Sequence, residues 1–226
     1  MENLNPIKLF LNRIYYYFFV ERFNKKLKIE FPKDIKRWDL IQKIIDKKKY
    51  DNYLEIGCDK DQSFSKIIVK NKIGVDPISG GNVRSTSDRF FSINTNKFDI
   101  IFIDGLHHYE QVIKDVNNSL KILNDNGFIL LHDCLPRSIA HQAIPRYRGS
   151  WNGDVWKALV ELRTRSDLDT YTCQIDFGVG IVQKKTNTEI LSIEKKNFKH
   201  LKFSDYYYNF NSYMRVIDYK KALDLI

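Results

Sequence analysis

The fold of this chain is decided by one stretch, Phe98-Asp99-Ile100-Ile101-Phe102-Ile103-Asp104-Gly105-Leu106-His107-His108-Tyr109-Glu110. Residues 98–104 form a nearly continuous apolar run, which indicates a buried strand. Residues 109–123 then repeat apolar side chains at helical spacing, so an amphipathic helix is expected to follow. A buried strand that leads into a helix predicts a parallel sheet covered by helices.

The same alternation continues on both sides of this unit. Further strands are predicted over residues 53–57, 72–76 and 127–133, and helices over residues 6–28, 37–48, 63–69 and 154–165. Two more strands, over residues 171–175 and 180–183, are separated by only four residues. We expect them to pair antiparallel, because a parallel crossover needs about a dozen residues or more.

Acidic residues stand at the ends of four predicted strands, namely Glu55, Asp76, Asp104 and Asp133. Open α/β sheets bind ligands outside the carboxyl ends of their strands. Gly57 follows the first strand, and Asp76 lies 21 residues after Glu55, where a carboxylate can accept hydrogen bonds from ribose hydroxyls. This spacing predicts a bound nucleoside. The alternative is a turn glycine beside a solvated aspartate.

The loop after the first strand narrows the choice of nucleoside. Gly57-Cys58-Asp59-Lys60-Asp61 lacks the second and third glycines that let a backbone approach a pyrophosphate. It also adds negative charge where a diphosphate would sit. A nucleoside without phosphates and with a cationic centre suits such a loop better, which favours S-adenosylmethionine on grounds of charge.

Longer motifs surround these residues. They are Tyr53-Leu54-Glu55-Ile56-Gly57, Gly74-Val75-Asp76-Pro77, Thr86-Ser87-Asp88-Arg89-Phe90-Phe91, Phe102-Ile103-Asp104-Gly105-Leu106-His107-His108-Tyr109-Glu110, Leu131-His132-Asp133-Cys134, Trp151-Asn152-Gly153-Asp154-Val155-Trp156-Lys157 and Asp176-Phe177-Gly178-Val179-Gly180. In this order they resemble the class I S-adenosylmethionine-dependent methyltransferases, in the bacterial branch with F-I-D-G-x-H-x-Y-E and H-D motifs associated with surface-glycan O-methylation. The chain departs from many methyltransferases at Asp61, where they carry a third glycine.

The resemblance implies a fold class and a domain layout. The fold would be α/β, with a Rossmann-like doubly wound seven-stranded sheet, mostly parallel with a reversed last strand, plus N-terminal helices and a C-terminal helical tail. We expect an N-terminal helical extension over residues 1–36 and a methyltransferase domain over residues 37–185. A tail over residues 186–226 is expected to pack on the domain or on a partner subunit.

The resemblance also implies an activity, O-methylation of a sugar or nucleotide-sugar hydroxyl in surface-polysaccharide biosynthesis. The cofactor is expected to be S-adenosylmethionine, bound by Glu55, Gly57, Asp76, Ser87, Asp88 and Asp104. Two other classes stay open. A metallohydrolase would use the Asp and His cluster without a methyl donor, and a non-catalytic nucleoside-binding protein would bind the cofactor and transfer nothing.

Four residues at two strand ends are the candidate catalytic groups, namely His107, His108, His132 and Asp133. A neutral histidine has a pKa of about 6.5 and can take the proton of an acceptor hydroxyl. Alternatively, Asp104 and Asp133 hold a divalent cation, Mg²⁺ or Mn²⁺, that lowers the pKa of that hydroxyl. The plainer alternative is that the histidines hydrogen-bond loops while Asp104 caps a helix or holds the cofactor amine.

Basic residues follow the second of these strand ends, namely Arg137, Arg146, Arg148 and Lys157. They are candidates for binding an anionic group of the acceptor, such as the diphosphate of a nucleotide sugar. The alternative is a solvated basic loop.

The net charge of +9 is unevenly distributed. Residues 1–50 carry 13 Lys and Arg against 6 Asp and Glu, residues 51–135 carry 9 against 12, and residues 136–226 carry 15 against 10. Lys outnumbers Arg by 26 to 11, whereas a base-reading surface favours the bidentate Arg, so no nucleic-acid partner is expected. A solvated basic surface is the first interpretation, and attraction to an anionic substrate or membrane face is the alternative.

The sequence also bears on location. The longest apolar run, residues 14–20, is far shorter than the roughly 20 residues of a membrane span, so no transmembrane segment is expected. The N-terminus is unlike a secretory signal, and three widely spaced cysteines predict no disulfide framework, so a cytoplasmic enzyme with reduced thiols is expected.

Two aromatic clusters lie outside the predicted sheet. Residues 15–19, Tyr-Tyr-Tyr-Phe-Phe, are expected to pack on the domain or a partner subunit, with interfacial membrane contact as the alternative. The tail with Tyr206-Tyr207-Tyr208 is expected to cover a sheet edge or a subunit contact rather than to form a lid over the acceptor. A homo-oligomer is therefore an open alternative.

Overall fold

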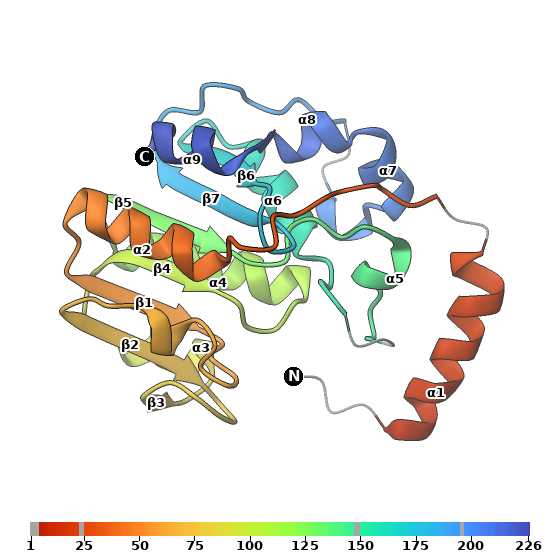
Figure 1. Ribbon diagram of the computed structural model, residues 1–226, viewed down its shortest axis with the longest axis horizontal. Coiled ribbons are helices and arrows are strands. Elements are labelled where there is room, and N and C mark those ends of the chain that lie inside the picture. Colours follow the sequence, from red (N-terminus) through yellow and green to blue (C-terminus); the bar gives the residue numbers. More distant parts are fainter. Residues whose placement is uncertain (1–4, 23–24, 147–149, 195–196) are drawn as a thin grey trace.

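The computed structural model describes residues 5–22, 25–146, 150–194 and 197–226. Within these residues one sheet of eight strands runs through the molecule, in the order β3-β2-β1-β4-β5-β7-β6-β8 (Figure 1). The strands are β1 Asn52–Ile56, β2 Asn71–Asp76, β3 Val83–Arg84, β4 Phe98–Ile103, β5 Leu123–Leu131, β6 Leu168–Cys173, β7 Val179–Lys184 and β8 Val216–Ile217. β7 pairs antiparallel with both β5 and β6, and the other neighbours pair parallel. The predicted mostly parallel α/β fold with a reversed strand is confirmed.

The sheet has one strand more than expected. The two-residue strands β3 and β8 lie at its two edges, and neither is long enough to give a period-two pattern in the sequence. β8 comes from the C-terminal tail and pairs with β6 through Thr172 opposite Val216.

The described residues contain nine α-helices around the sheet. They are α1 Pro6–Tyr15, α2 Arg37–Lys48, α3 Ser87–Ile93, α4 Tyr109–Ile122, α5 Ile139–Gln142, α6 Val155–Arg163, α7 Phe203–Tyr208, α8 Phe210–Met214 and α9 Tyr219–Leu225, with a π-helical turn over Tyr16–Glu21 and 3-10 turns over Phe64–Lys66 and Phe198–His200. α2 and α9 pack on one face of the sheet, and α3, α4 and α6 pack on the other.

Side chains of alternate residues of β4 point into the two hydrophobic cores, one on each face of the sheet. Ile101 and Ile103 contact the core under α4 and α6, whereas Ile100 and Phe102 contact the core under α2. All four side chains are buried, because a central strand covered on both faces has no solvent side. Burial of each such side chain contributes about 1.5–3 kcal/mol, which explains why this stretch reads as a continuous apolar run.

The predicted helix over residues 63–69 is wrong, since only the 3-10 turn Phe64–Lys66 forms there. Side chains from neighbouring elements take up the backbone groups that a helix would need. Lys72 Nζ donates to the carbonyls of Phe64 and Ile67 at 2.8 and 2.9 Å, and the Gln42 side chain bonds both the N–H and the carbonyl of Ile68.

The predicted helix over residues 6–28 also ends early. The π-helical turn ends at Glu21, and residues 25–32 run without helical structure. Leu27 N–H donates to the carbonyl of Arg137 at 2.9 Å, and Ile29 is buried in the core under α4. These tertiary contacts hold the segment in an extended course toward α2. Residues 23–24 lie outside the described part of the chain.

The C-terminal tail lies against the rest of the fold. Tyr206 is fully buried, and its ring lies 4.9 Å from that of Trp156 on α6. The Thr172 hydroxyl donates to the carbonyl of Met214 at 2.7 Å, beside the pairing of β6 with β8. The tail thus covers the outer edge of the sheet. No helix in the described ranges has the length and apolar character that crossing a bilayer would demand.

Candidate functional site

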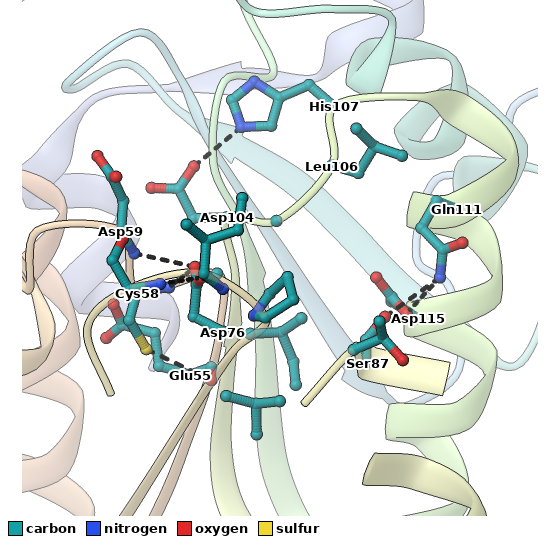
Figure 2. A pocket seen from close by; sticks show the side chains of 18 of the residues that line it. Glu55, Cys58, Asp59, Asp76, Ser87, Asp104, Leu106, His107, Gln111 and Asp115 are labelled. Carbon is teal, nitrogen blue, oxygen red and sulfur yellow. Dashed lines mark hydrogen bonds and ion pairs between the residues drawn. The ribbon is translucent and has the colours of Figure 1, made fainter. Parts of the chain in front are cut away.

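A pocket of about 550 Å³ opens at the carboxyl ends of β1, β2 and β4 (Figure 2). All six residues predicted to hold a nucleoside line it, namely Glu55, Gly57, Asp76, Ser87, Asp88 and Asp104. Its lining contains six carboxylates and only three Lys or Arg side chains, Arg37, Lys60 and Arg146. The pocket therefore has the size of a small-molecule site and an acidic wall.

Gly57 allows the ends of β1 and β4 to meet at the floor of this pocket. Its φ is +88°, in the region that favours glycine. A Cβ at this position would lie 2.6 Å from the carbonyl carbon of Asp104 and 2.5 Å from Gly105 Cα, both of them backbone atoms that cannot move aside cheaply.

Asp76 ties together the loops that follow β1 and β2. Its Oδ2 accepts from the backbone N–H groups of Cys58 and Asp59, both at 3.1 Å, and its Oδ1 accepts from those of Ile78 and Ser79 at 2.8 and 2.9 Å. Burial alone would raise the pKa of Asp76, but the four backbone donors outweigh burial and lower that pKa. The carboxylate is thus held ionised at the pocket wall.

Asp61, the residue that replaces a glycine, takes the glycine-like conformation itself. Its φ is +59°, and its Oδ1 accepts from the backbone N–H of Gly81 at 2.7 Å. Aspartate tolerates the left-handed region better than most residues. The loop therefore keeps a tight turn and gains a bond to the turn after β2.

Glu55 lies on the β1 side of the pocket and is almost fully buried. Burial raises its pKa to about 8, although a hydrogen bond from the Tyr53 hydroxyl works in the other direction. A buried carboxyl group with this pKa changes its protonation state near neutral pH. A cationic ligand in the pocket would favour its ionised form.

A polar group on α3 and α4 lines the opposite side of the pocket (Figure 2). Gln111 Nε2 lies 3.2 Å from Ser87 Oγ, 3.1 Å from Asp88 Oδ1 and 3.0 Å from Asp115 Oδ1. Burial raises the pKa of Asp115 to about 6. Gln111 and Asp115 were not predicted from the sequence. The available signal was Asp115 beside Val116, a polar residue at a buried position of a helix whose spacing is otherwise apolar.

Asp104 is the centre of a charged cluster at the end of β4. Its Oδ1 lies 3.1 Å from His107 Nε2 and 3.2 Å from His132 Nδ1, and its Oδ2 lies 3.5 Å from Arg37 Nε. Burial would raise the pKa of Asp104, but the two histidines outweigh burial and hold that pKa well below its usual range. The carboxylate is ionised and its charge is balanced locally.

His132 lies behind Asp104 and does not line the pocket. Its Nδ1 faces Asp104, and its Nε2 lies 2.8 Å from the carbonyl oxygen of Asp176. Both partners are acceptors, and a neutral imidazole has only one N–H, so the doubly protonated ring satisfies both. Burial opposes this charge, but Asp104 and Asp133 outweigh it and raise the pKa of His132 well above the ordinary value.

His107 does line the pocket. Its Nε2 faces Asp104, while its Nδ1 lies 3.3 Å from Asp133 Oδ2 without hydrogen-bond geometry to any described group. The ring stacks on Trp151, with centroids 5.2 Å apart and planes 18° apart. Burial would lower the pKa of His107, but Asp104 and Asp133 raise it above 6.5.

The motif around Trp151 holds this histidine in place. A Cβ on Gly153 would lie 2.5 Å from His107 Cβ, so the two segments are in direct contact. Asn152 Nδ2 donates to Asp133 Oδ1 at 2.9 Å, and Asp154 N–H donates to the carbonyl of His107 at 3.1 Å. The motif was recognised in the sequence, but no role was assigned to it.

The other predicted catalytic residues take different places. Asp133 is buried at the end of β5 behind His107, and burial raises its pKa. His108 is outside the pocket lining, because it precedes α4 as its N-cap residue and its ring meets Trp151 edge-on at 6.1 Å. Arg37 was not predicted either, and its Nη1 lies 2.9 Å from Asp176 Oδ2. Asp176 belongs to a recognised motif, whereas nothing near Arg37 pointed to the site.

Three of these side chains have the arrangement of a metal site. Asp104, His107 and Asp133 each offer one ligand atom, and these atoms lie within 4.8 Å of one another. Two carboxylates and an imidazole suit Mn²⁺, whereas Mg²⁺ prefers oxygen ligands throughout.

Of the predicted acceptor-binding basic residues that the structure describes, Arg146 alone lines the pocket, and its guanidinium lies 5.8 Å from the Trp151 ring centroid. Arg137 lies over the rings of Phe31 and Phe177, and Lys157 pairs with Asp154 at 3.0 Å. Arg148 lies outside the described residues.

Comparison with known proteins agrees with this architecture. Residues 39–134 match the family model described as a methyltransferase domain. The uncharacterized protein R132 of Acanthamoeba polyphaga mimivirus is 32% identical over 123 residues, which is 41% of this chain and 56% of that protein. The chain thus spans little more than half the length of this relative.

Solved structures share the fold. The O-methyltransferase of Bacillus cereus, in complex with S-adenosylhomocysteine (SAH), superposes with a TM-score of 0.50 at 11% identity, over 69% of this chain and 84% of that one. The SAH-bound methyltransferase PaMTH1 of Podospora anserina superposes with a TM-score of 0.50 at 16% identity, over 82% and 99% of the two chains. At these identities the likeness to solved structures establishes the fold, and the family match covers residues 39–134.

Proposed function

We propose that this protein is an S-adenosylmethionine-dependent O-methyltransferase. One observation carries the proposal: a single acidic pocket at the carboxyl edge of a methyltransferase-type sheet brings the predicted nucleoside residues together with a histidine at one end. A metallohydrolase would not need the nucleoside residues, and a non-catalytic nucleoside-binding protein would not need the histidine.

The pocket suits a cationic nucleoside. We assign Asp76 to the ribose, the group of Ser87, Asp88 and Gln111 to the adenine, and Glu55 and Asp104 to the positively charged end of the ligand. The six carboxylates of the lining would disfavour a diphosphate. When bound, S-adenosylmethionine supplies a methyl group on a sulfonium, which reacts in line with an acceptor oxygen on the opposite side.

His107 is the group that we assign to the acceptor hydroxyl. Its Nε2 faces Asp104 at the pocket wall (Figure 2). In the tautomer that directs Nδ1–H at Asp133, an acceptor hydroxyl that replaces Asp104 as the neighbour of Nε2 would give its proton to this nitrogen. Asp133 lies behind Nδ1 and would stabilise the imidazolium that results, in the way that a third group orients a catalytic base. His132 and Arg37 act as positioning residues. His132 holds Asp104 from outside the pocket lining, and Arg37 bridges Asp104 to Asp176.

A divalent cation is the second candidate for activating the hydroxyl. Asp104, His107 and Asp133 would hold Mg²⁺ or Mn²⁺, and such an ion would lower the pKa of a hydroxyl bound to it. We place it second because Arg37 and the two histidines already balance the charge of Asp104.

For the acceptor, we propose a sugar or nucleotide-sugar hydroxyl in cytoplasmic surface-polysaccharide biosynthesis. The support is Arg146 over Trp151 at the histidine end of the pocket, since an aromatic face suits a sugar ring and a guanidinium suits a phosphate. For the domain layout, we propose an N-terminal extension over residues 1–36, a methyltransferase domain over residues 37–185 and a tail over residues 186–226.

The direct test incubates the full chain with labelled S-adenosylmethionine and a panel of nucleotide sugars, followed by mass spectrometry, with and without EDTA. A mass increase of one methyl group on an acceptor supports the proposal, and its persistence in EDTA selects the histidine route. Binding of SAH without transfer to any member of a broad hydroxyl panel would favour the nucleoside-binding alternative. Hydrolysis without methyl donor would favour the metallohydrolase.

A further inference from the structure

α1 presents an apolar face to solvent. Ile7, Phe10, Leu11 and Ile14 recur at the spacing that puts side chains on one side of a helix, and they are 70%, 62%, 58% and 41% exposed. The other side of this segment is the one that contacts the domain, where Leu9 and Tyr16 pack against Ala140 and Ala143. The helix is therefore attached to the domain through Leu9 and Tyr16, while its larger apolar face is exposed to solvent.

The π-helical turn that follows continues this surface with aromatic rings. Tyr17, Phe18 and Phe19 are 66%, 52% and 68% exposed, and the rings of Tyr17 and Phe18 pack on each other edge to face at 5.1 Å. Exposure of so many large apolar side chains on one short segment marks an interaction surface. Aromatic rings are also favoured at the boundary between lipid and water.

Basic side chains border the same surface. Lys8 and Arg13 are exposed on α1 on either side of its apolar face, and Lys26 and Lys28 are exposed just beyond the turn. Lys25 instead donates to the Tyr208 hydroxyl at 3.1 Å. Residues 6–28 contain six Lys and Arg against one Glu. A helix with an apolar face, aromatic residues and a basic border is the pattern of a helix that lies in the interface of an anionic membrane.

We propose that α1 and the π-helical turn, Pro6–Glu21, dock this protein on a membrane surface that contains anionic phospholipid. The apolar face enters the boundary between headgroups and acyl chains, and the basic residues contact lipid phosphates. A second copy of the chain is a poorer occupant, because a two-fold interface through this face would bring Lys8 and Arg13 near their own counterparts. The proposal does not depend on methyl transfer.

Docking also bears on the pocket. α1 lies on the side of the molecule toward which β1 and β2 point (Figure 1), which is the edge of the sheet that carries the pocket. The membrane surface would then lie beside the pocket rather than behind the sheet.

Flotation of the full chain with vesicles tests the proposal. We expect binding to vesicles of phosphatidylcholine mixed with phosphatidylglycerol, weakened by salt, and little binding to phosphatidylcholine alone. Each basic residue near the surface is worth about fivefold in binding, so K8E/R13E should bind at least about 25-fold more weakly. F10S/L11S/F18S should lose about tenfold or more. The matched control I68S/I93S changes two side chains that are 80% and 71% exposed outside the segment, and it should bind as the wild type does.

Three outcomes would overturn the proposal. One is failure of the wild type to bind anionic vesicles at low salt. Another is equal binding by the wild type, K8E/R13E and F10S/L11S/F18S, each with an unchanged melting temperature. The third is a dimer in light scattering that F10S/L11S/F18S dissociates, without any binding to vesicles, which would assign the face to a second copy.

Discussion

Asp76 and Asp104 stand at the ends of β2 and β4 in the same pocket, and both have a lowered pKa for different reasons. Four backbone N–H groups hold Asp76, whereas Arg37, His107 and His132 surround Asp104. Backbone donors keep their hydrogen at every pH, but histidines do not. At the proposed nucleoside end of the pocket, the hold on Asp76 is therefore insensitive to pH, whereas at the proposed chemical end the hold on Asp104 changes as the histidines titrate.

The largest expected effect lies at the chemical end. His107→Ala should lower kcat by about 10²–10⁴-fold, because a general base is worth that much, and should leave the affinity for SAH unchanged in calorimetry. His200→Ala, at an exposed histidine remote from the pocket, is the matched control and should retain full activity. An equal loss of SAH affinity in His107→Ala would instead place His107 at the nucleoside end.

The pH profile sharpens the same contrast. His107 must be neutral to accept a proton, and its pKa is raised above 6.5 by Asp104 and Asp133, so kcat should rise with pH through a midpoint above that value. The weakening of SAH binding caused by Asp76→Asn should change much less across the same range, because backbone N–H groups hold Asp76 at every pH. A flat kcat profile would remove the histidine from proton transfer.

Gly57→Ala should disturb both ends, because Gly57 joins them. Its positive φ and the close backbone of Asp104 and Gly105 predict a loss of about 2–5 kcal/mol in the free energy of unfolding, measured by urea denaturation. Gly105→Ala is the control, since its added Cβ would meet Ile56 Cγ2 at an ordinary 3.5 Å. Equal stability of the two variants would contradict the close approach of the strands.

At the nucleoside end, Asp76→Asn should weaken SAH binding by roughly tenfold to hundredfold, because hydrogen bonds to a charged group contribute about 1.5–3 kcal/mol. Calorimetry measures this effect, with Asp125→Asn, an exposed carboxylate on β5, as the control. Unchanged affinity in Asp76→Asn would remove Asp76 from the binding site and leave it a loop organiser.

The smallest effect concerns Glu55 and stability. The pKa of Glu55 is about 8 in the fold against 4.5 ordinarily, so its protonated form stabilises the fold. This contribution is complete below pH 4.5 and is lost as the pH rises through about 8. Between pH 5 and pH 9 the melting temperature of Glu55→Gln should therefore fall less than that of the wild type. Differential scanning calorimetry should show a difference of a few degrees between the two falls. Parallel curves for the two proteins would show that Glu55 is ionised throughout.

The parts of the fold that local patterns determine were predictable. The helix over residues 37–48 matches α2, and the strands containing Glu55, Asp76 and Asp104 lie where the apolar runs placed them. Parallel pairing then brings their ends to one edge, so the pocket could be expected before any coordinates.

The rest depended on contacts between distant segments. Arg37 reaches Asp104 and Asp176 from the first turn of α2, and no spacing rule links three such positions. The helix expected over residues 63–69 failed because Lys72 and Gln42 bind its backbone, which is a tertiary event. Likewise, His107, His108 and His132 were equivalent by type, and the structure separates them by the direction in which each ring points.

Asp61 has a consequence for how loops of this kind are detected. The turn after β1 requires a residue that tolerates a left-handed backbone, and at φ +59° this aspartate meets the requirement while its side chain binds Gly81. A search pattern that demands glycine at this position would reject a chain whose loop closes correctly. A search pattern that accepts any residue tolerant of a left-handed backbone, namely Gly, Asn or Asp, would retain this chain.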